Sequence, residues 1–122
     1  MEKITQNTYR KLVVWQKSMD LVTTLYIELK NFPPEELYTL TSQIKRAAIS
    51  IPSNIAEGYG RSSNKEYQRF LNISLSSLFE LQTQLEISKN LTYLDSEKFD
   101  RLYENTREVE RMLSSLIRKI SS

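Results

Sequence analysis

The sequence predicts an all-α fold, namely an antiparallel up-down-up-down four-helix bundle with a proline kink in the second helix. Apolar residues recur at steps of three and four along four separate segments. Short stretches with proline, glycine or capping residues separate these segments, and the sequence contains no β-hairpin pattern. At 122 residues the chain suits a single domain, 1–122, in which the polar, aperiodic residues 1–10 form a flexible or docking arm.

The first predicted helix runs from about residue 14 to about residue 31. Its apolar face consists of Trp15, Met19, Val22, Tyr26 and Leu29. Pro33 ends this helix because the residue before a proline avoids helical geometry. Pro34 suits the first turn of the second helix, where Glu35 and Glu36 would lie near the positive end of the helix dipole.

Pro52 lies within the second predicted helix without interrupting its apolar pattern. The residues that stay in phase through it are Leu37, Thr41, Ile44, Ala48, Ile51, Ile55 and Tyr59. We therefore predict one bent helix, because a proline offers no N–H to the carbonyl four residues earlier and its ring presses against that carbonyl. The helix is expected to end at Gly58 or Gly60, since either glycine can adopt the left-handed conformation of a C-cap.

A polar stripe lies opposite this apolar face and consists of Arg46, Ser50, Asn54, Glu57 and Arg61. Two interpretations remain open. The stripe can be a solvated face beside a tolerated kink, or it can hold the bend through contacts across helices or between subunits. On the second interpretation, the residues assigned to the kink or to a subunit contact are Arg46, Ser50, Pro52, Asn54, Glu57 and Gly58.

The third predicted helix spans about residues 64–90, and Ser63 and Glu66 before and within it have the spacing of a capping box. Ser74 and Ser77 lie inside its apolar stripe, where small side chains let a neighbouring helix approach closely. A fourth amphipathic segment follows and continues to the end of the sequence. Its expected N-cap is Asp95, the residue type that accepts hydrogen bonds from the first free N–H groups of a helix.

Composition excludes several classes of function. The chain has no cysteine and no histidine, which removes thiolate nucleophiles, cysteine metal sites and the Glu-x-x-His pairs of di-iron bundles. No carboxylate pair has metal-ligand or acid/base spacing, and no glycine-rich loop could cradle a phosphate. We therefore predict a protein that is not an enzyme and that has no metal, cofactor or small-molecule substrate. The absence of a secretory segment and of a long apolar run predicts a cytoplasmic protein without a membrane partner.

The formal net charge is only +2, yet the basic residues are clustered. The clusters are Lys3, Arg10, Lys11 and Lys17 near the start, Arg61, Lys65 and Arg69 after the second helix, and Arg111, Arg118 and Lys119 near the end. Solubility and favourable charge at a helix C-terminus are ordinary explanations for each cluster. A symmetric assembly that joined the clusters would instead indicate phosphate binding. The candidate nucleic-acid contacts are Arg10, Lys11, Lys17, Arg61, Lys65 and Arg69.

Four segments carry a resemblance to a known family: residues 15–21, 40–58, 67–71 and 78–85. They resemble the bacterial four-helix-bundle proteins known as 23S rRNA intervening-sequence proteins, with nearly all of residues 11–120 covered and the run Ser-Ile-Pro-Ser-Asn-Ile-Ala-Glu-Gly as the most specific match. Members are sometimes encoded within sequences inserted in large-subunit ribosomal RNA genes, and their biochemical role is largely undefined. The sequence departs from the family at Ser76-Ser77, where a Gly or Ala usually stands beside the serine, and at Gln82, where Glu is usual.

The family is also similar to the accessory variability determinant of diversity-generating retroelements, a basic, barrel-shaped homopentamer that binds nucleic acid and the reverse transcriptase. The resemblance implies a four-helix protomer that assembles with copies of itself, with a ring of five as the implied assembly. Together with the basic clusters, it predicts a non-enzymatic homo-oligomer that binds structured RNA or DNA. The alternative is a protein-interaction or scaffold module that never contacts nucleic acid, which exposure of Ile49, Phe70 and Ile73 would favour.

Overall fold

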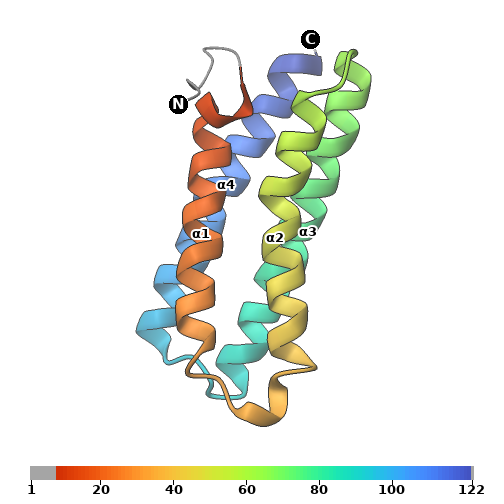
Figure 1. The fold of residues 1–122 in the computed structure, drawn as a ribbon. Coiled ribbons are helices and arrows are strands. Elements are labelled where there is room, and N and C mark those ends of the chain that lie inside the picture. The colour runs from red at the N-terminus through yellow and green to blue at the C-terminus, as the bar shows by residue number, and fades with distance from the viewer. Residues whose placement is uncertain (1–7, 122) are drawn as a thin grey trace, which may run out of the picture.

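The computed structural model describes residues 8–121 as four long helices with short connections (Figure 1). The elements are η1 (Tyr9–Lys11), α1 (Val13–Leu29), η2 (Pro34–Glu36), α2 (Leu40–Tyr59), α3 (Asn64–Asn90) and α4 (Ser96–Ser121). The described residues contain no strand, which confirms the all-α prediction. Residues 1–7 of the predicted arm lie outside the described residues, whereas Tyr9 of the same arm packs edge-on against Trp15, with ring centroids 5.2 Å apart.

Contacts between helices show that neighbouring helices run in opposite directions. The pairs that fix this order are Lys17 with Glu108 and Glu28 with Lys98 between α1 and α4, and Ile51 with Ser74 and Ser50 with Ser77 between α2 and α3. From Lys17 to Glu28 along α1, the partner on α4 moves back from Glu108 to Lys98. From Ser50 to Ile51 along α2, the partner on α3 moves back from Ser77 to Ser74, so both helix pairs are antiparallel. The α1–α2 and α3–α4 connections therefore lie at one end of the bundle, and the α2–α3 turn lies at the other end with the start of α1 and the end of α4 (Figure 1).

One hydrophobic core fills the space between the four helices, and each helix contributes residues with almost no exposed surface. Where α2 meets α3, small side chains such as Ala47 and Ser74 are buried. The Ser74 hydroxyl donates a 2.8 Å hydrogen bond to the carbonyl of Ile51, so this buried polar group is satisfied across the helix interface. Ser74 and Ser77 thus face α2, as their place in the apolar stripe predicts.

Side-chain caps define the helix ends at two predicted positions. The Ser63 hydroxyl accepts a 3.1 Å hydrogen bond from the Glu66 N–H, and the Asp95 carboxylate accepts one of 2.8 Å from the Lys98 N–H. These bonds satisfy N–H groups that the first turn of a helix otherwise leaves without a partner. Both predicted caps are therefore confirmed.

The start of α2 differs from the prediction. Pro34 begins the separate turn η2, and α2 begins only at Leu40, because Thr39 has a non-helical backbone with φ −121° and ψ −102°. The Glu36 carboxylate accepts hydrogen bonds from the Thr39 hydroxyl and the Leu40 N–H, and its other oxygen accepts one of 2.8 Å from the Tyr93 hydroxyl. Glu36 therefore joins the α1–α2 connection to the α3–α4 connection.

Pro52 lies inside α2, which continues as one helix on both sides of it, as predicted. The bend itself stays a prediction. The expected left-handed C-cap is wrong, because Gly60 has φ −79° and neither glycine has a positive φ. Gly58 serves a packing role instead: a Cβ built there would lie 2.7 Å from the Phe70 Cβ, so a glycine is required for α2 and α3 to approach this closely.

Among residues 8–121, none of the helices combines the length and the apolar character that crossing a bilayer demands.

Candidate nucleic-acid interface

Basic clusters that are far apart in the sequence lie at one end of the bundle. They are Arg10 and Lys11 before α1, Arg61, Lys65 and Arg69 around the α2–α3 turn, and Arg118 and Lys119 in the last turn of α4. Their convergence follows from topology, because the start of α1, the end of α4 and the α2–α3 turn all meet at this end (Figure 1). Five of the six candidate phosphate contacts are exposed, and Lys17 is half-buried.

Dividing each helix at its midpoint reveals a segregation of charge along the bundle. The basic half comprises residues 8–20, 51–77 and 109–121, and the acidic half comprises residues 21–50 and 78–108. The basic half holds nine Lys and Arg against four Asp and Glu, whereas the acidic half holds seven against ten. The net charges are therefore +5 and −3, and the overall value of +2 conceals a strongly basic end.

The α2–α3 turn places two arginines over one aromatic ring. The guanidinium carbons of Arg61 and Arg69 lie 4.8 and 4.5 Å from the centroid of the Phe70 ring, which is within the range of cation–π attraction. Glu57 pairs with Arg61 and Glu66 pairs with Arg69 at 3.1 Å, yet the two arginine side chains remain 42% and 56% exposed. The structure thus adds Phe70 to this cluster, which the basic residues alone did not reveal.

A hydrogen bond within this cluster favours the charged forms of Glu66 and Arg69. The bond that the Arg69 side chain donates lowers the pKa of the Glu66 carboxyl and raises the pKa of Arg69. Lys65 forms no ion pair with any residue from 8 to 121. The cluster therefore presents a lone ammonium beside two guanidiniums whose orientation is set by neighbouring carboxylates.

The cluster before α1 lies on a different side of the same end. Arg10 and Lys11 are exposed next to the Tyr9–Trp15 pair, while the ammonium of Lys17 lies 3.5 Å from the Glu108 carboxylate on α4. Both clusters thus combine cations with aromatic rings. Lys17 differs from the paired Arg61 and Arg69 in that its acidic partner lies on another helix.

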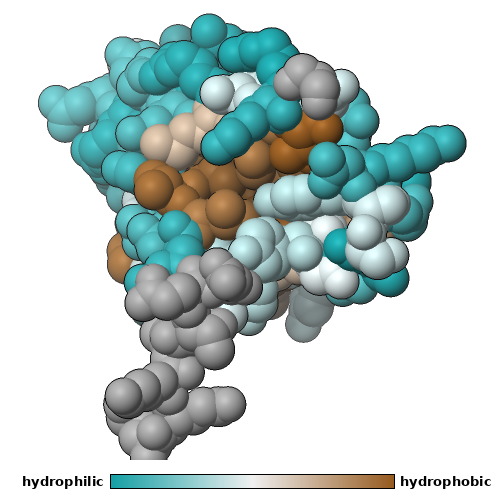
Figure 2. Space-filling model, turned by 90° about the horizontal axis from the view of Figure 1, so that it is seen from above, coloured by the Kyte–Doolittle hydropathy of each residue, from teal (hydrophilic) through white to brown (hydrophobic). Residues whose placement is uncertain are grey.

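Apolar side chains gather in the centre of this end, inside a rim of hydrophilic ones (Figure 2). The partly buried hydrophobic residues from the adjoining helix ends are Leu12, Met112, Leu116, Ile117 and Ile120. A shallow groove between α1 and α4 continues this surface, and Arg111 and Lys119 border it. The basic end is therefore not uniformly polar.

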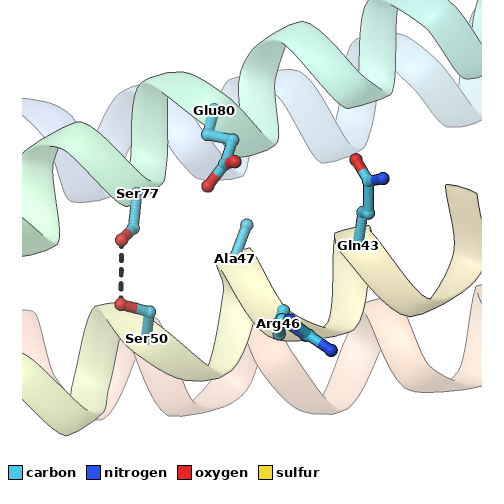
Figure 3. Close-up of a pocket in the computed structure, with 6 residues that line it drawn as sticks. All are labelled: Gln43, Arg46, Ala47, Ser50, Ser77 and Glu80. Carbon is cyan, nitrogen blue, oxygen red and sulfur yellow. Dashed lines mark hydrogen bonds between the residues drawn. The ribbon is translucent and has the colours of Figure 1, made fainter.

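The residues assigned to the kink or to a subunit contact fall into three places. Arg46 and Ser50 line a cleft between α2 and α3, together with Gln43, Ala47, Ser77 and Glu80 (Figure 3). The Ser77 hydroxyl donates a 2.8 Å hydrogen bond to the Ser50 hydroxyl, which also accepts one from the Asn54 amide. Glu57 and Gly58 instead belong to the basic end.

Pro52 faces another direction. It is buried beside a groove between α1 and α2 that Trp15, Met19 and Ile49 also line. Pro52 and the Ser50–Asn54 network thus lie on different sides of α2. A role of the stripe in holding the bend or a subunit contact stays a prediction.

The cleft between α2 and α3 lacks the arrangement of a hydrolytic site. Its two serine hydroxyls bond to each other, and within residues 8–121 no carboxylate accepts a hydrogen bond from either one. A nucleophilic serine needs a neighbouring base. The described part of the chain also contains no group of three or more acidic, histidine or cysteine side chains placed to hold a metal ion.

Comparison with known proteins now places the chain. The sequence profile of a family described as the 23S rRNA-intervening sequence protein matches residues 10–115. The chain belongs to this family. The resemblance to this family stated from the sequence is therefore confirmed.

Gln82 is one position at which the sequence departs from the family. Its amide donates hydrogen bonds to the Thr106 hydroxyl and, at 3.0 Å, to the Glu110 carboxylate, which a glutamate at position 82 would repel.

A solved structure of a family relative has the same fold. It is a protein of unknown function from the S23 ribosomal protein family of Bacteroides thetaiotaomicron, with 26% sequence identity and a TM-score of 0.81. The match covers 86% of this chain and 98% of that chain. No curated protein matches the sequence. Neither the family nor the relative is described as an enzyme.

Proposed function

We propose that this 23S rRNA-intervening sequence protein is a non-enzymatic, self-associating bundle that binds structured RNA or DNA through its basic half. The segregation of charge carries the proposal: nine basic and four acidic residues share the half that contains the α2–α3 turn. Phosphate backbones bind such surfaces because each neutralised phosphate releases condensed counterions. Arg61, Lys65 and Arg69 supply the main contacts, with Arg10 and Lys11 next and Lys17 last.

The test is fluorescence anisotropy with a structured RNA and a duplex DNA, titrated at low and moderate salt. The triple variant Arg61→Ala, Lys65→Ala, Arg69→Ala should bind more weakly and should reduce the slope of log K against log salt by about 0.9 for each phosphate that the variant no longer neutralises. A matched control removes three positive charges from the acidic half through Lys30→Ala, Lys89→Ala and Arg107→Ala. Equal effects of the two triples would mean that only net charge matters, and failure of the wild type to bind at low salt would overturn the proposal.

Self-association is supported by exposed apolar residues on two faces. Ile49 of α2 is 44% exposed beside the α1–α2 groove, and Ile73 of α3 is 37% exposed on the outer face of that helix. Two different patches are what a head-to-tail contact needs, and such contacts close into rings when the rotation permits. Light scattering should give the mass of several copies, and Ile49→Ser with Ile73→Ser should shift that mass toward 14.4 kDa. A wild-type mass of one copy would refute self-association.

The same exposed residues favour the second candidate function, a module that docks another polypeptide. Ile49 and Ile73 are exposed, as this alternative requires, whereas Phe70 is half-buried and meets the requirement less well. The two candidates separate in one experiment. If the protein is a monomer and binds neither RNA nor DNA, the docking of another polypeptide to its exposed apolar faces is favoured. If it binds nucleic acid in a salt-sensitive way, phosphate binding by the basic half is favoured.

A further inference from the structure

The basic half is suited to one class of nucleic acid more than to another. A duplex presents phosphates outward and hides the faces of its bases in the stack, whereas unpaired nucleotides expose those faces. We infer that the segment bound by this protein is unpaired, as in a single strand or a loop, and that its bases stack on the Arg61–Phe70–Arg69 cluster. This inference rests on the proposed function and specifies its ligand.

The planar groups of this cluster carry the inference. The guanidinium carbons of Arg61 and Arg69 lie within 5 Å of the Phe70 ring centroid, and arginine planes as well as aromatic rings are the surfaces on which unpaired bases stack. Glu57 and Glu66 hold the guanidiniums by ion pairs, so the arrangement exists before a ligand arrives. Lys65 lies in the same turn with no ion-pair partner in residues 8–121, which leaves it to contact a phosphate.

The rest of this end has the same mixed character. Apolar side chains occupy its centre inside a hydrophilic rim (Figure 2), and the Tyr9–Trp15 pair stands beside Arg10 and Lys11 on the other side. A duplex lying across this end would bury apolar side chains against phosphates. A strand with exposed bases can instead place apolar rings over the centre and phosphates over the rim.

The test compares a labelled single strand of about 16 nucleotides with the same strand annealed to its complement, by anisotropy at one low salt concentration. The wild type should bind the single strand at least about fivefold more tightly, since stacking one base adds that much or more. Phe70→Leu should remove most of this preference. The control is Phe79→Leu, which changes another phenylalanine of α3. Phe79 is exposed, and within residues 8–121 no cation lies over its ring.

A second variant keeps the charge and the fold. Arg61→Lys with Arg69→Lys changes two exposed side chains and replaces planar guanidiniums by ammonium groups, so the ratio of single-strand to duplex affinity should fall by at least about fivefold. Equal wild-type binding of both ligands, or unchanged ratios in both variants, would overturn the inference and leave the proposed function standing. Binding of neither ligand would overturn the proposed function itself.

Discussion

The two halves of the bundle share one hydrophobic core but use their charged residues differently. In the acidic half, charges connect separate helices: Glu28 of α1 meets Lys98 and Arg101 of α4, Lys45 of α2 lies over Tyr26 of α1, and Lys89 of α3 lies over Phe99 of α4. In the basic half, the pairs Glu57–Arg61 and Glu66–Arg69 each join residues three or four positions apart in the sequence. Lys17 is an exception, since it pairs with Glu108 of α4, and Arg61 also lies over Phe70 of α3.

This difference shows which charges the fold depends on. Contacts between helices fix their relative placement, whereas short-range pairs along one segment add only a few tenths of a kcal/mol and leave the helix packing unaffected. The short-range ion pairs of Arg61 and Arg69 can therefore be exchanged for a ligand at little structural cost. A contact between distant residues also joins the two helix connections of the acidic half, where the Tyr93 hydroxyl donates a hydrogen bond to Glu36, 57 positions away in the sequence.

The largest expected effect tests whether the basic half is nevertheless tightly packed. Gly58→Ala should reduce the free energy of unfolding by about 1–3 kcal/mol, because the new Cβ would clash with Phe70 at 2.7 Å. Gly60→Ala is the control, since its Cβ would meet nothing closer than 3.7 Å and its φ is negative. Urea unfolding measures both variants. Equal stabilities would mean that α2 and α3 separate easily at this end.

A smaller effect is expected from a charge in the acidic half. Glu28 is only 16% exposed and lies 3.8 Å from Lys98 and 3.7 Å from Arg101. Glu28→Ala should therefore cost about 1 kcal/mol in chemical unfolding, at the upper end of what surface ion pairs contribute. High salt should reduce the difference from the wild type. No loss of stability would remove the structural distinction between the halves.

The corresponding change in the basic half should affect binding more than folding. Glu57→Ala removes a pair within one turn, so we expect a loss of about 0.3–0.5 kcal/mol. It also raises the local positive charge, so binding to a labelled duplex DNA, which depends on charge and not on stacking, should become tighter and more sensitive to salt. Weaker duplex binding would contradict the prediction.

The smallest effect concerns pH. Hydrogen bonds from Thr39, and then from Tyr93, lower the pKa of Glu36 below its ordinary value of 4.5. A carboxyl with a lowered folded-state pKa stabilises the fold above its unfolded value, and this contribution is lost as pH falls through the lowered one. The melting temperatures of wild type and Glu36→Gln should therefore differ at neutral pH and converge as the pH falls through the lowered pKa of Glu36. A constant difference would contradict the linkage.

Features that depend on nearby residues could be predicted from the sequence. The period of apolar residues predicted α1 and α3 nearly to their ends, and Ser63 and Asp95 were recognisable as caps because they precede the groups they bond. The late start of α2 could not be predicted, because Pro34 fits a helix start equally well. The Glu36–Tyr93 bond was also beyond reach, since its partners are far apart in the chain.

The candidate site shows the same division. Its lysines and arginines were visible as clusters, and alternating helix directions place those clusters at one end once four helices are accepted. The C-cap at Gly60 was one of the two predicted helix ends, but the packing role of Gly58 was not foreseen because the sequence does not show that Phe70 lies opposite it. For the same reason, the contact of Arg61 with the Phe70 ring emerged only from the structure, whereas Arg69 is next to Phe70 in the sequence.

The separation of charge along the bundle also gives the molecule a dipole moment along its long axis, so an electric field orients it. Antiparallel neighbours cancel most of the helix dipoles, so the remaining dipole moment comes from the side chains. The centres of the two halves lie about 20 Å apart, from the rise of 1.5 Å per residue, which is more than twice the screening length at physiological salt. A polyanion near one end is therefore screened from the other end. In dilute buffer the whole molecule rotates before contact, which speeds association.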